Sequence, residues 1–116
     1  MNEEIKTEDR QHVRIYFENP IVIYQITQSQ SGNVFMIDRI KILGKSKDIS
    51  MGGIRAELAN AASLSKYMKL NFELKKNGPL EIYTERIWEK AELCGLRFIQ
   101  PDNNISKQIS NYVSHP

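Results

Sequence analysis

The chain has 116 residues and a formal net charge of +2, with 41% hydrophobic and 26% charged residues. This length fits one domain with one core, and this composition is ordinary for a folded globular protein, so it excludes wholesale disorder. The small surplus of positive charge falls short of the basic stripe of a nucleic-acid-binding module, and we therefore expect no polymeric nucleic acid as a partner.

The first ten residues, MNEEIKTEDR, are acidic and polar. They lack the apolar segment of a secretory signal, and no run in the chain approaches the ~18 apolar residues that a membrane-spanning helix needs. We therefore expect a cytoplasmic protein without membrane insertion. Residues 1–9, which carry four acids, are expected to form a flexible lead-in.

From Val13 the pattern changes to a period of two, which is typical of a strand. Val13, Ile15 and Phe17 alternate with polar or amphipathic residues, and the β-branched run IVIYQI follows Pro20. A polar loop, TQSQSGN, then leads into VFMIDRIKIL, which predicts a strand that ends at Gly44.

Three later segments show the clearest alternation of apolar and polar residues. Their apolar positions are Ile54, Ala56 and Leu58; Met68, Leu70, Phe72 and Leu74; and Cys94, Leu96 and Phe98. Between the second and third segments, Asn77 and Gly78 give a strong signal for a tight turn, so residues 67–91 are predicted to form one long hairpin. The piece LANAASLSKY fits either a helical turn or an irregular connection.

The last element differs in kind, because its apolar residues recur at helical spacing. Ile105, Ile109, Tyr112 and Val113 lie at i, i+4, i+7 and i+8, and Asp or Asn residues before them can cap a helix. About six short strands with regularly spaced turns and one closing helix predict a mostly β protein, a small antiparallel barrel capped by a helix.

Catalytic constellations are missing from the sequence. The only histidines are His12 and His115, near the two ends, so no Ser-His-Asp, Cys-His or HExxH arrangement can be assembled. Cys94 is the only cysteine, which excludes an intramolecular disulfide and a thiolate metal cage. We therefore expect no enzyme, no metal and no cofactor.

Some cations and the single tryptophan have two interpretations each. Lys45, Lys47, Lys75 and Lys76 lie next to turn glycines, where lysines are usually solvated loop charges, although they could also contact a phosphate. Trp88 fits the barrel wall or the core better than a platform on which a ligand base stacks.

Two polar motifs remain to be explained. The first, DRQHVRI, places Arg10 and Arg14 four residues apart, where the lead-in meets the first strand. The second, KDISMGGIRAEL, places Asp48, Ser50 and Gly53 at what reads as a polar turn that enters a strand. Each motif is unspecific on its own. Together they resemble the two-part signature of the PilZ domain family, RxxxR followed by (D/N)xSxxG, in the right order and at each internal spacing.

The resemblance extends beyond the motifs and covers nearly all of the chain from Arg10 to Val113. The segment KLNFELKKNGPLEIYTERIWEKAELCGLRFIQ is similar to the family's late hairpin and G-x-x-F strand, and ISKQISNYV is similar to its closing helix. The resemblance implies a six-stranded antiparallel β-barrel with a C-terminal α-helix. This PilZ-like domain would span residues 10–116, with an arm at 10–14, a barrel at about 13–100 and the helix at about 103–114.

The resemblance also implies a function. Family members bind cyclic di-GMP, a bacterial second messenger, and pass that state to an effector protein, which the sequence does not identify. The ligand-binding residues would be Arg10, Arg14, Asp48, Ser50 and Gly53. These residue types suit the ligand, because arginine forks bind guanine edges and phosphates and stack on purines, while a carboxylate accepts guanine N–H groups.

The two halves of the predicted site differ in mobility. The second motif belongs to the barrel, whereas Arg10 and Arg14 lie on a mobile arm, so ligand binding is expected to fold the arm over the barrel. Many family members carry another basic residue just before the first motif arginine, which favours a stacked pair of ligands. Here that position is Asp9, and we expect one cyclic di-GMP per protomer.

Two alternatives stay open. The chain could be a PilZ-like adaptor that keeps the fold but does not bind the nucleotide. It could also be a small barrel that binds single-stranded nucleic acid, although the low net charge and the lack of an aromatic stripe count against this.

Overall fold

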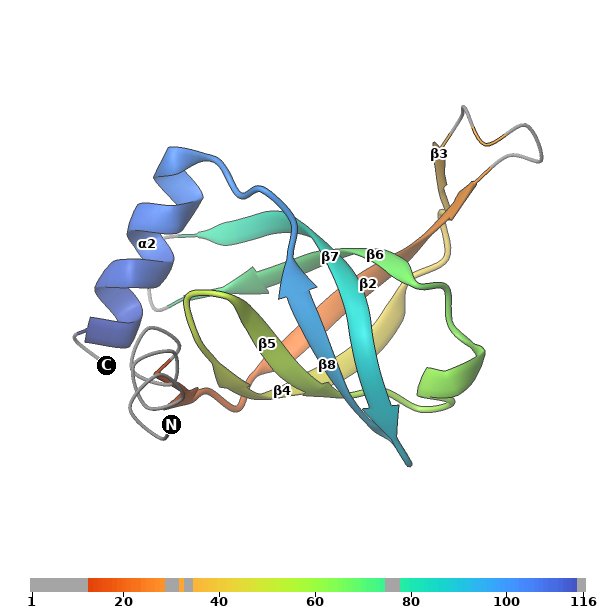
Figure 1. Cartoon of the computed structure of the whole chain (residues 1–116), viewed down its shortest axis with the longest axis horizontal. Coiled ribbons are helices and arrows are strands. Elements are labelled where there is room, and N and C mark those ends of the chain that lie inside the picture. The colour runs from red at the N-terminus through yellow and green to blue at the C-terminus, as the bar shows by residue number, and fades with distance from the viewer. Residues whose placement is uncertain (1–12, 29–31, 33–34, 75–77, 115–116) are drawn as a thin grey trace, which may run out of the picture.

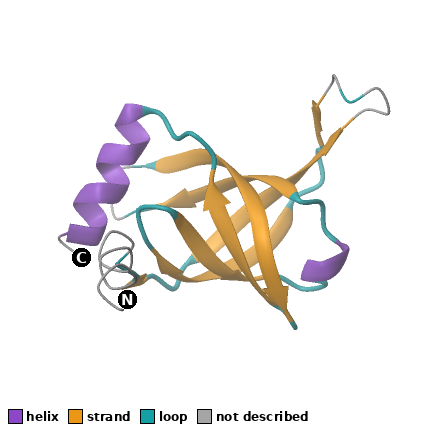
Figure 2. Cartoon of the chain, viewed as in Figure 1, coloured by secondary structure: helices purple, strands orange, loops and turns teal. Residues whose placement is uncertain are grey.

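The structure is a computed structural model that describes residues 13–28, 32, 35–74 and 78–114. Figures 1 and 2 show the chain as a barrel of strands with a helix at one end and a projecting hairpin at the other. The strands are β1 (Ile15–Tyr16), β2 (Pro20–Gln28), β3 (Phe35–Ile37), β4 (Ile42–Ile49), β5 (Gly53–Glu57), β6 (Tyr67–Glu73), β7 (Pro79–Lys90) and β8 (Leu93–Phe98). The helical elements are the 3-10 turn η1 (Ala61–Ser63) and the helix α2 (Asn103–Ser114).

Six strands close the barrel in the order β2, β4, β5, β8, β7 and β6, and every pairing is antiparallel. The ring closes because β2 pairs with β6 on one side and with β4 on the other. Two short strands lie outside this ring, β1 on β4 and β3 on the far half of β2. The predicted six-stranded antiparallel barrel with a C-terminal helix is confirmed.

The core is formed by the alternating apolar positions that the sequence predicts. Every one of them is buried: Ile54, Ala56, Leu58, Met68, Leu70, Phe72, Leu74, Cys94, Leu96 and Phe98. Burial of each leucine or isoleucine contributes about 1.5–3 kcal/mol. The ring of Phe17 contacts those of Phe72 and Tyr112, which ties the first segment and the helix to the same core.

Helix α2 covers one end of the barrel with its predicted apolar face (Figure 1). Ile109 is buried, and Ile105, Tyr112 and Val113 pack against the core cluster. The carboxylate of Asp102 accepts a hydrogen bond from the backbone N–H of Ile105 at 2.8 Å, which satisfies one of the free donors at the helix start.

The predicted hairpin at residues 67–91 is confirmed, with β6 and β7 paired from Tyr67 and Glu85 to Glu73 and Pro79. The ambiguous piece LANAASLSKY contains the 3-10 turn η1. Among the described residues, no helix is long and apolar enough to cross a membrane.

The single strand predicted for VFMIDRIKIL, ending at Gly44, is wrong, because the segment contains all of β3 and the start of β4. Strand β3 ends at Ile37, where the Asp38 side chain accepts a hydrogen bond from the backbone N–H of Ile40 and forms a bend. Strand β4 then runs through Gly44 to Ile49. This glycine allows close packing within the sheet, because a Cβ atom there would lie 2.3 Å from a methyl group of Leu58.

Candidate ligand-binding site

The second motif spans the hairpin between β4 and β5. Asp48 lies within β4, Ser50 begins the turn and Gly53 begins β5. The expected polar turn is therefore shorter than predicted, and Asp48 belongs to the strand before it. The backbone N–H of Ser50 donates to the carbonyl of Gly53 at 2.9 Å, and its hydroxyl accepts from Gly52 N–H at 3.3 Å. Ser50 therefore holds the turn, and all three motif residues are buried.

Gly53 needs to be a glycine for a reason unrelated to turn geometry. Its φ is not in the left-handed region. A Cβ atom at this position would instead lie 2.2 Å from the backbone carbonyl oxygen of Leu96 on β8. The glycine therefore lets β5 and β8 approach each other at the site.

Strand pairing brings the two motifs together. Ile15 and Tyr16 pair with Ile49 and Asp48, which places Arg14 beside the end of β4. Nη1 of Arg14 lies 2.8 Å from Oδ1 of Asp48, and the carboxylate side chain is only 10% exposed while the arginine is 51% exposed. Arg10 lies outside the described residues.

A second arginine holds the other carboxylate oxygen. Nη2 of Arg55 lies 2.7 Å from Oδ2 of Asp48, and the two residues are register partners on β5 and β4. Our sequence reasoning missed Arg55. Its signal was the position two residues after the motif glycine, from which an antiparallel hairpin returns it to Asp48.

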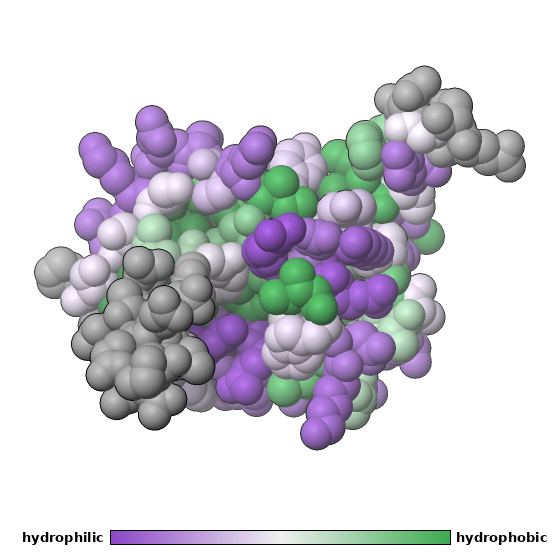
Figure 3. Space-filling model, in the orientation of Figure 1, coloured by the Kyte–Doolittle hydropathy of each residue, from purple (hydrophilic) through white to green (hydrophobic). Residues whose placement is uncertain are grey.

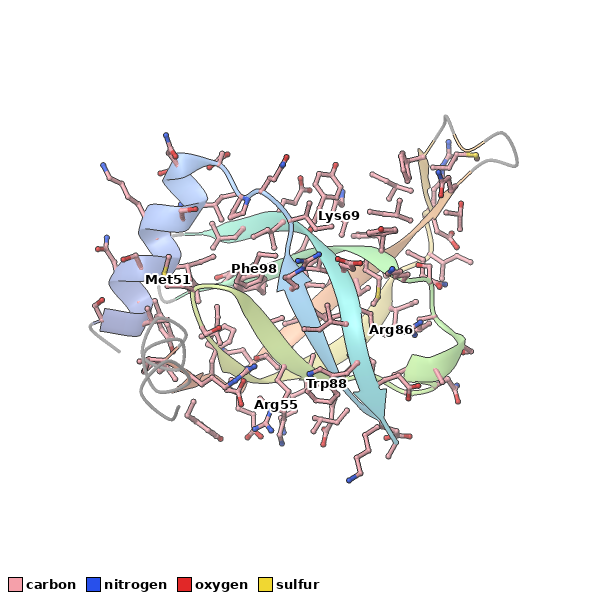
Figure 4. The ribbon with its side chains drawn as sticks, in the orientation of Figure 1. Met51, Arg55, Lys69, Arg86, Trp88 and Phe98 are labelled. Carbon is pink, nitrogen blue, oxygen red and sulfur yellow. The ribbon has the colours of Figure 1, made fainter. Side chains whose placement is uncertain are left out.

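Trp88 lies in the same row of the sheet as Arg55. Both residues are register partners of Gly95, one from β7 and one from β5, and Figure 4 shows their side chains on the same flank of the barrel. The indole lies over Gly95, where a Cβ atom would be 2.3 Å from Nε1. Trp88 is thus part of the barrel wall, as expected, but it is 38% exposed and does not belong to the core.

A cavity of ≈ 370 Å³ lies beside these groups. Its lining comes from the end of the first segment, the β4–β5 turn and the outer surface of β7 and β8: Arg14, Ser50, Gly52, Gly53, Ile54, Ile87, Trp88, Gly95, Leu96, Arg97 and Phe98. The cavity thus combines two guanidinium groups, the backbone of the adjacent glycines Gly52 and Gly53, and the aromatic side chains of Trp88 and Phe98. Such a surface can bind an anionic ligand that also carries flat rings.

The second cation of the cavity takes part in an ion-pair network. Arg97 bonds to Glu85, whose other oxygen lies 3.2 Å from Nζ of Lys66. The hydrogen bond from Arg97, followed by that from Lys66, lowers the pKa of the Glu85 carboxyl. The network keeps Glu85 ionised and fixes Arg97 at the cavity edge.

The lysines of β4 are paired with a carboxylate. Nζ of Lys47 lies 2.9 Å and Nζ of Lys45 lies 3.6 Å from the carboxylate of Glu18. The hydrogen bond from Lys47, with one from Tyr16, lowers the pKa of Glu18 to about 2. These lysines are therefore strand residues in ion pairs, and not the loop charges that the sequence suggested; Lys75 and Lys76 lie outside the described residues.

Comparison with known proteins shows what the chain is similar to. The family model described as PilZ domain matches residues 8–115. The PilZ domain of CeSA from a cellulose-synthesizing bacterium is 16% identical with a TM-score of 0.59, covering 87% of this chain and 94% of that chain. The PilZ domain of YcgR from Escherichia coli with c-di-GMP has the same identity and TM-score, covering 90% and 88%.

A structure of YcgR from Escherichia coli in complex with c-di-GMP is 17% identical with a TM-score of 0.56, and the match covers 90% of this chain and 44% of that chain. No curated protein matches the chain. At these identities the likeness to the solved structures establishes the fold.

Proposed function

Because the chain belongs to the PilZ domain family, we propose that it is a receptor for cyclic di-GMP. The observation that carries the proposal is the contact of Arg14 with Asp48 beside the cavity that Arg14, Ser50 and Gly53 line. Two of the similar structures, both of YcgR, are named as containing c-di-GMP. Since this messenger acts inside bacterial cells, we propose a cytoplasmic protein with a binding and not a catalytic role.

The chemistry of the ligand fits the groups at the cavity. Cyclic di-GMP has two guanines and two phosphodiesters, so a receptor needs forked donors for the O6 and N7 edge, cations for phosphates and an acceptor for the N1 and N2 hydrogens. Arg10 and Arg14 would supply the forks. Asp48 would supply the acceptor, because each carboxylate oxygen can accept a second hydrogen bond beside that from an arginine.

Two further groups complete the proposed site. The Ser50 hydroxyl can donate to a phosphate, and Gly53 with Gly52 lets the ligand approach the backbone of the β4–β5 turn. Trp88 and Arg97 extend the surface on the β7 and β8 side, where the indole face is partly exposed.

We propose that ligand binding orders the arm that carries Arg10. Arg14 is the point at which the arm joins the barrel, since its guanidinium contacts Asp48. Arg10 lies four residues before it and would close over a bound nucleotide. The ordered arm would form part of a new surface for an effector protein.

We propose one cyclic di-GMP per protomer, because Asp9 would repel the phosphates of a second ligand. Titration calorimetry of the full chain tests both parts of the proposal. Cyclic di-GMP should bind with a stoichiometry near one. In a thermal unfolding measurement it should also raise the melting temperature, whereas GTP and a short single-stranded oligonucleotide should leave the melting temperature unchanged. Absence of any cyclic di-GMP binding would leave the ligand-independent adaptor, and a stoichiometry of two would contradict the role given to Asp9.

A further inference from the structure

A second cavity, of ≈ 600 Å³, lies where the β2–β3 hairpin leaves the barrel. It is lined by Ile26, Phe35, Ile37, Tyr67, Tyr83, Ile99 and Gln100, which we call the hairpin groove. The groove shares no lining residue with the cavity beside Asp48. In the space-filling view of Figure 3, hydrophobic side chains gather at the base of the projecting hairpin.

The hairpin groove lies on the outside of the barrel. Met68 is buried in the core, so its neighbour Tyr67 points outward, since side chains alternate along a strand. Ile26 is the register partner of Tyr67 and therefore shares the outer face, yet it is only 9% exposed. An outward isoleucine is covered here because apolar side chains surround it, whereas the solvated face of an antiparallel sheet is usually polar.

Strand β3 presents an open edge at the rim of this groove. It ends the strand order and pairs, within the described chain, only with β2. Phe35, Met36 and Ile37 are 58%, 62% and 43% exposed. Proteins usually protect such an edge with charges or proline inside the strand, and β3 has neither. An open apolar edge is the structure to which an extended segment adds as a further strand.

The uncompensated charge beside the groove is positive. Lys66 and Arg97 share the carboxylate of Glu85 on β7. Lys69 pairs with the carboxylate of Glu81 on the same strand. Asp38 directly follows β3, and the exposed cations Arg39 and Lys41 come after it. None of the three takes part in any ion pair among the described residues, so two cations and one carboxylate leave a charge of +1. A partner that fits this surface has to bring negative charge next to apolar side chains.

We propose that the hairpin groove and the edge of β3 dock an extended segment of a partner protein in which apolar and acidic residues alternate. The apolar side chains occupy the groove, the backbone pairs with β3, and the acids face Arg39 and Lys41. A second copy of this chain fits poorly, because its own β3 carries no acid to face Arg39 and Lys41. A lipid surface also fits poorly, because the sequence SQSGNV between β2 and β3 has little to insert.

The test uses two synthetic peptides and the full chain. The acidic peptide is acetyl-Val-Glu-Val-Asp-Val-Glu-Val-amide, and its control has lysine in place of every acid. Titrated to about 1 mM while backbone amide signals are followed by NMR, the acidic peptide should shift the signals of β3, Tyr67, Tyr83 and Ile99, with an affinity about tenfold above that of the lysine peptide. Equal binding of the two peptides, shifts elsewhere, or no shifts at all would overturn the proposal.

A charge-reversed variant sharpens this test. Arg39→Glu with Lys41→Glu should lose the acidic peptide and bind the lysine peptide instead. The matched control, Lys90→Glu with Lys107→Glu, makes the same change in net charge at two exposed residues away from the groove and should keep the wild-type preference. Sedimentation that shows dimers, or flotation with anionic phospholipid vesicles, would overturn the proposed occupant if Arg39→Glu with Lys41→Glu abolishes either behaviour.

Discussion

The guanidinium of Arg14 lies 2.8 Å from the carboxylate of Asp48, across 34 residues of sequence. The contact joins the two halves of the signature, and its cause is the short pairing of β1 with the end of β4. Asp48 is held on its other oxygen by Arg55, so the proposed guanine acceptor is nearly buried, ionic and fixed in orientation. A preorganised acceptor loses less conformational entropy when the ligand arrives.

Substitution of either motif arginine should weaken cyclic di-GMP binding. Arg10→Ala or Arg14→Ala removes charge-assisted hydrogen bonds, and we expect a loss of roughly 2–3 kcal/mol, or about 30- to 200-fold in affinity. Titration calorimetry measures the change, and Lys107→Ala on the exposed side of α2 is the control that should bind like the wild type. Unchanged affinity in both arginine variants would refute the site.

Arg55 should matter for the choice of base. It holds one oxygen of Asp48, and in the proposed site Asp48 would accept the N1 and N2 hydrogens that guanine has and adenine lacks. Arg55→Gln should therefore narrow the preference for cyclic di-GMP over cyclic di-AMP by about tenfold. Arg55→Lys keeps the charge but loses the forked pair of donors, so its preference for cyclic di-GMP should lie between those of the wild type and Arg55→Gln. A general loss of affinity with the wild-type preference retained would show that Arg55 supports the fold but does not position Asp48.

Much of the fold follows from local patterns. The alternating runs at Ile54 to Leu58 and at Met68 to Leu74 bury the predicted side, and the helical spacing from Ile105 predicts the face that packs. These patterns can be recognised in the sequence because each element has one buried apolar face and one solvent-exposed polar face.

What the sequence did not predict depends on register. Arg55 meets Asp48 because the β4–β5 hairpin pairs Ile49 with Ile54, and the sequence reasoning had placed Asp48 in a turn and not in the strand that pairs with β5. The hairpin groove was missed for a related reason: Ile26 belongs to an apolar run that reads as one buried strand, although Ile23 points inward and Ile26 outward. Gly44 was taken for a strand end because close packing against Leu58 is a tertiary contact.

Trp88 should report ligand binding through its fluorescence. It is the only tryptophan, it lines the cavity beside Asp48, and its indole is partly exposed. Cyclic di-GMP should change the emission intensity with the same midpoint as the calorimetric titration. Gly95→Ala is the control variant, because the added methyl displaces the indole and should reduce this response. Calorimetric binding without any change in wild-type emission would place the ligand away from Trp88.

Gly53→Ala should destabilise the barrel as well as the site. The new methyl group would lie 2.2 Å from the carbonyl oxygen of Leu96, and backbone cannot move aside as a side chain can. We expect a decrease of about 1–3 kcal/mol in the free energy of unfolding, measured by urea titration. Met51→Ala in the same turn removes a partly exposed side chain and should change stability by less than about 0.5 kcal/mol. Wild-type stability in Gly53→Ala would mean that β5 and β8 separate without cost.

Cys94 should be unreactive in the native protein. Burial raises the pKa of its thiol to about 11, above the ordinary value of 9.0, and only the thiolate attacks disulfide reagents. At pH 8 an aromatic disulfide reagent should therefore modify it only after denaturant is added, whereas Lys107→Cys in a Cys94→Ala background should react at once.

The same pKa shift gives a pH dependence of stability. Below pH 9.0 the thiol keeps its proton in both states, and between 9.0 and about 11 the unfolded chain releases the proton while the native state retains it. The contribution of Cys94 to stability is therefore full below pH 9.0 and decreases as the pH rises through that window. Urea titrations of the wild type and of Cys94→Ala should run parallel up to pH 9.0 and converge above it. Parallel curves up to pH 11 would contradict the burial of this thiol.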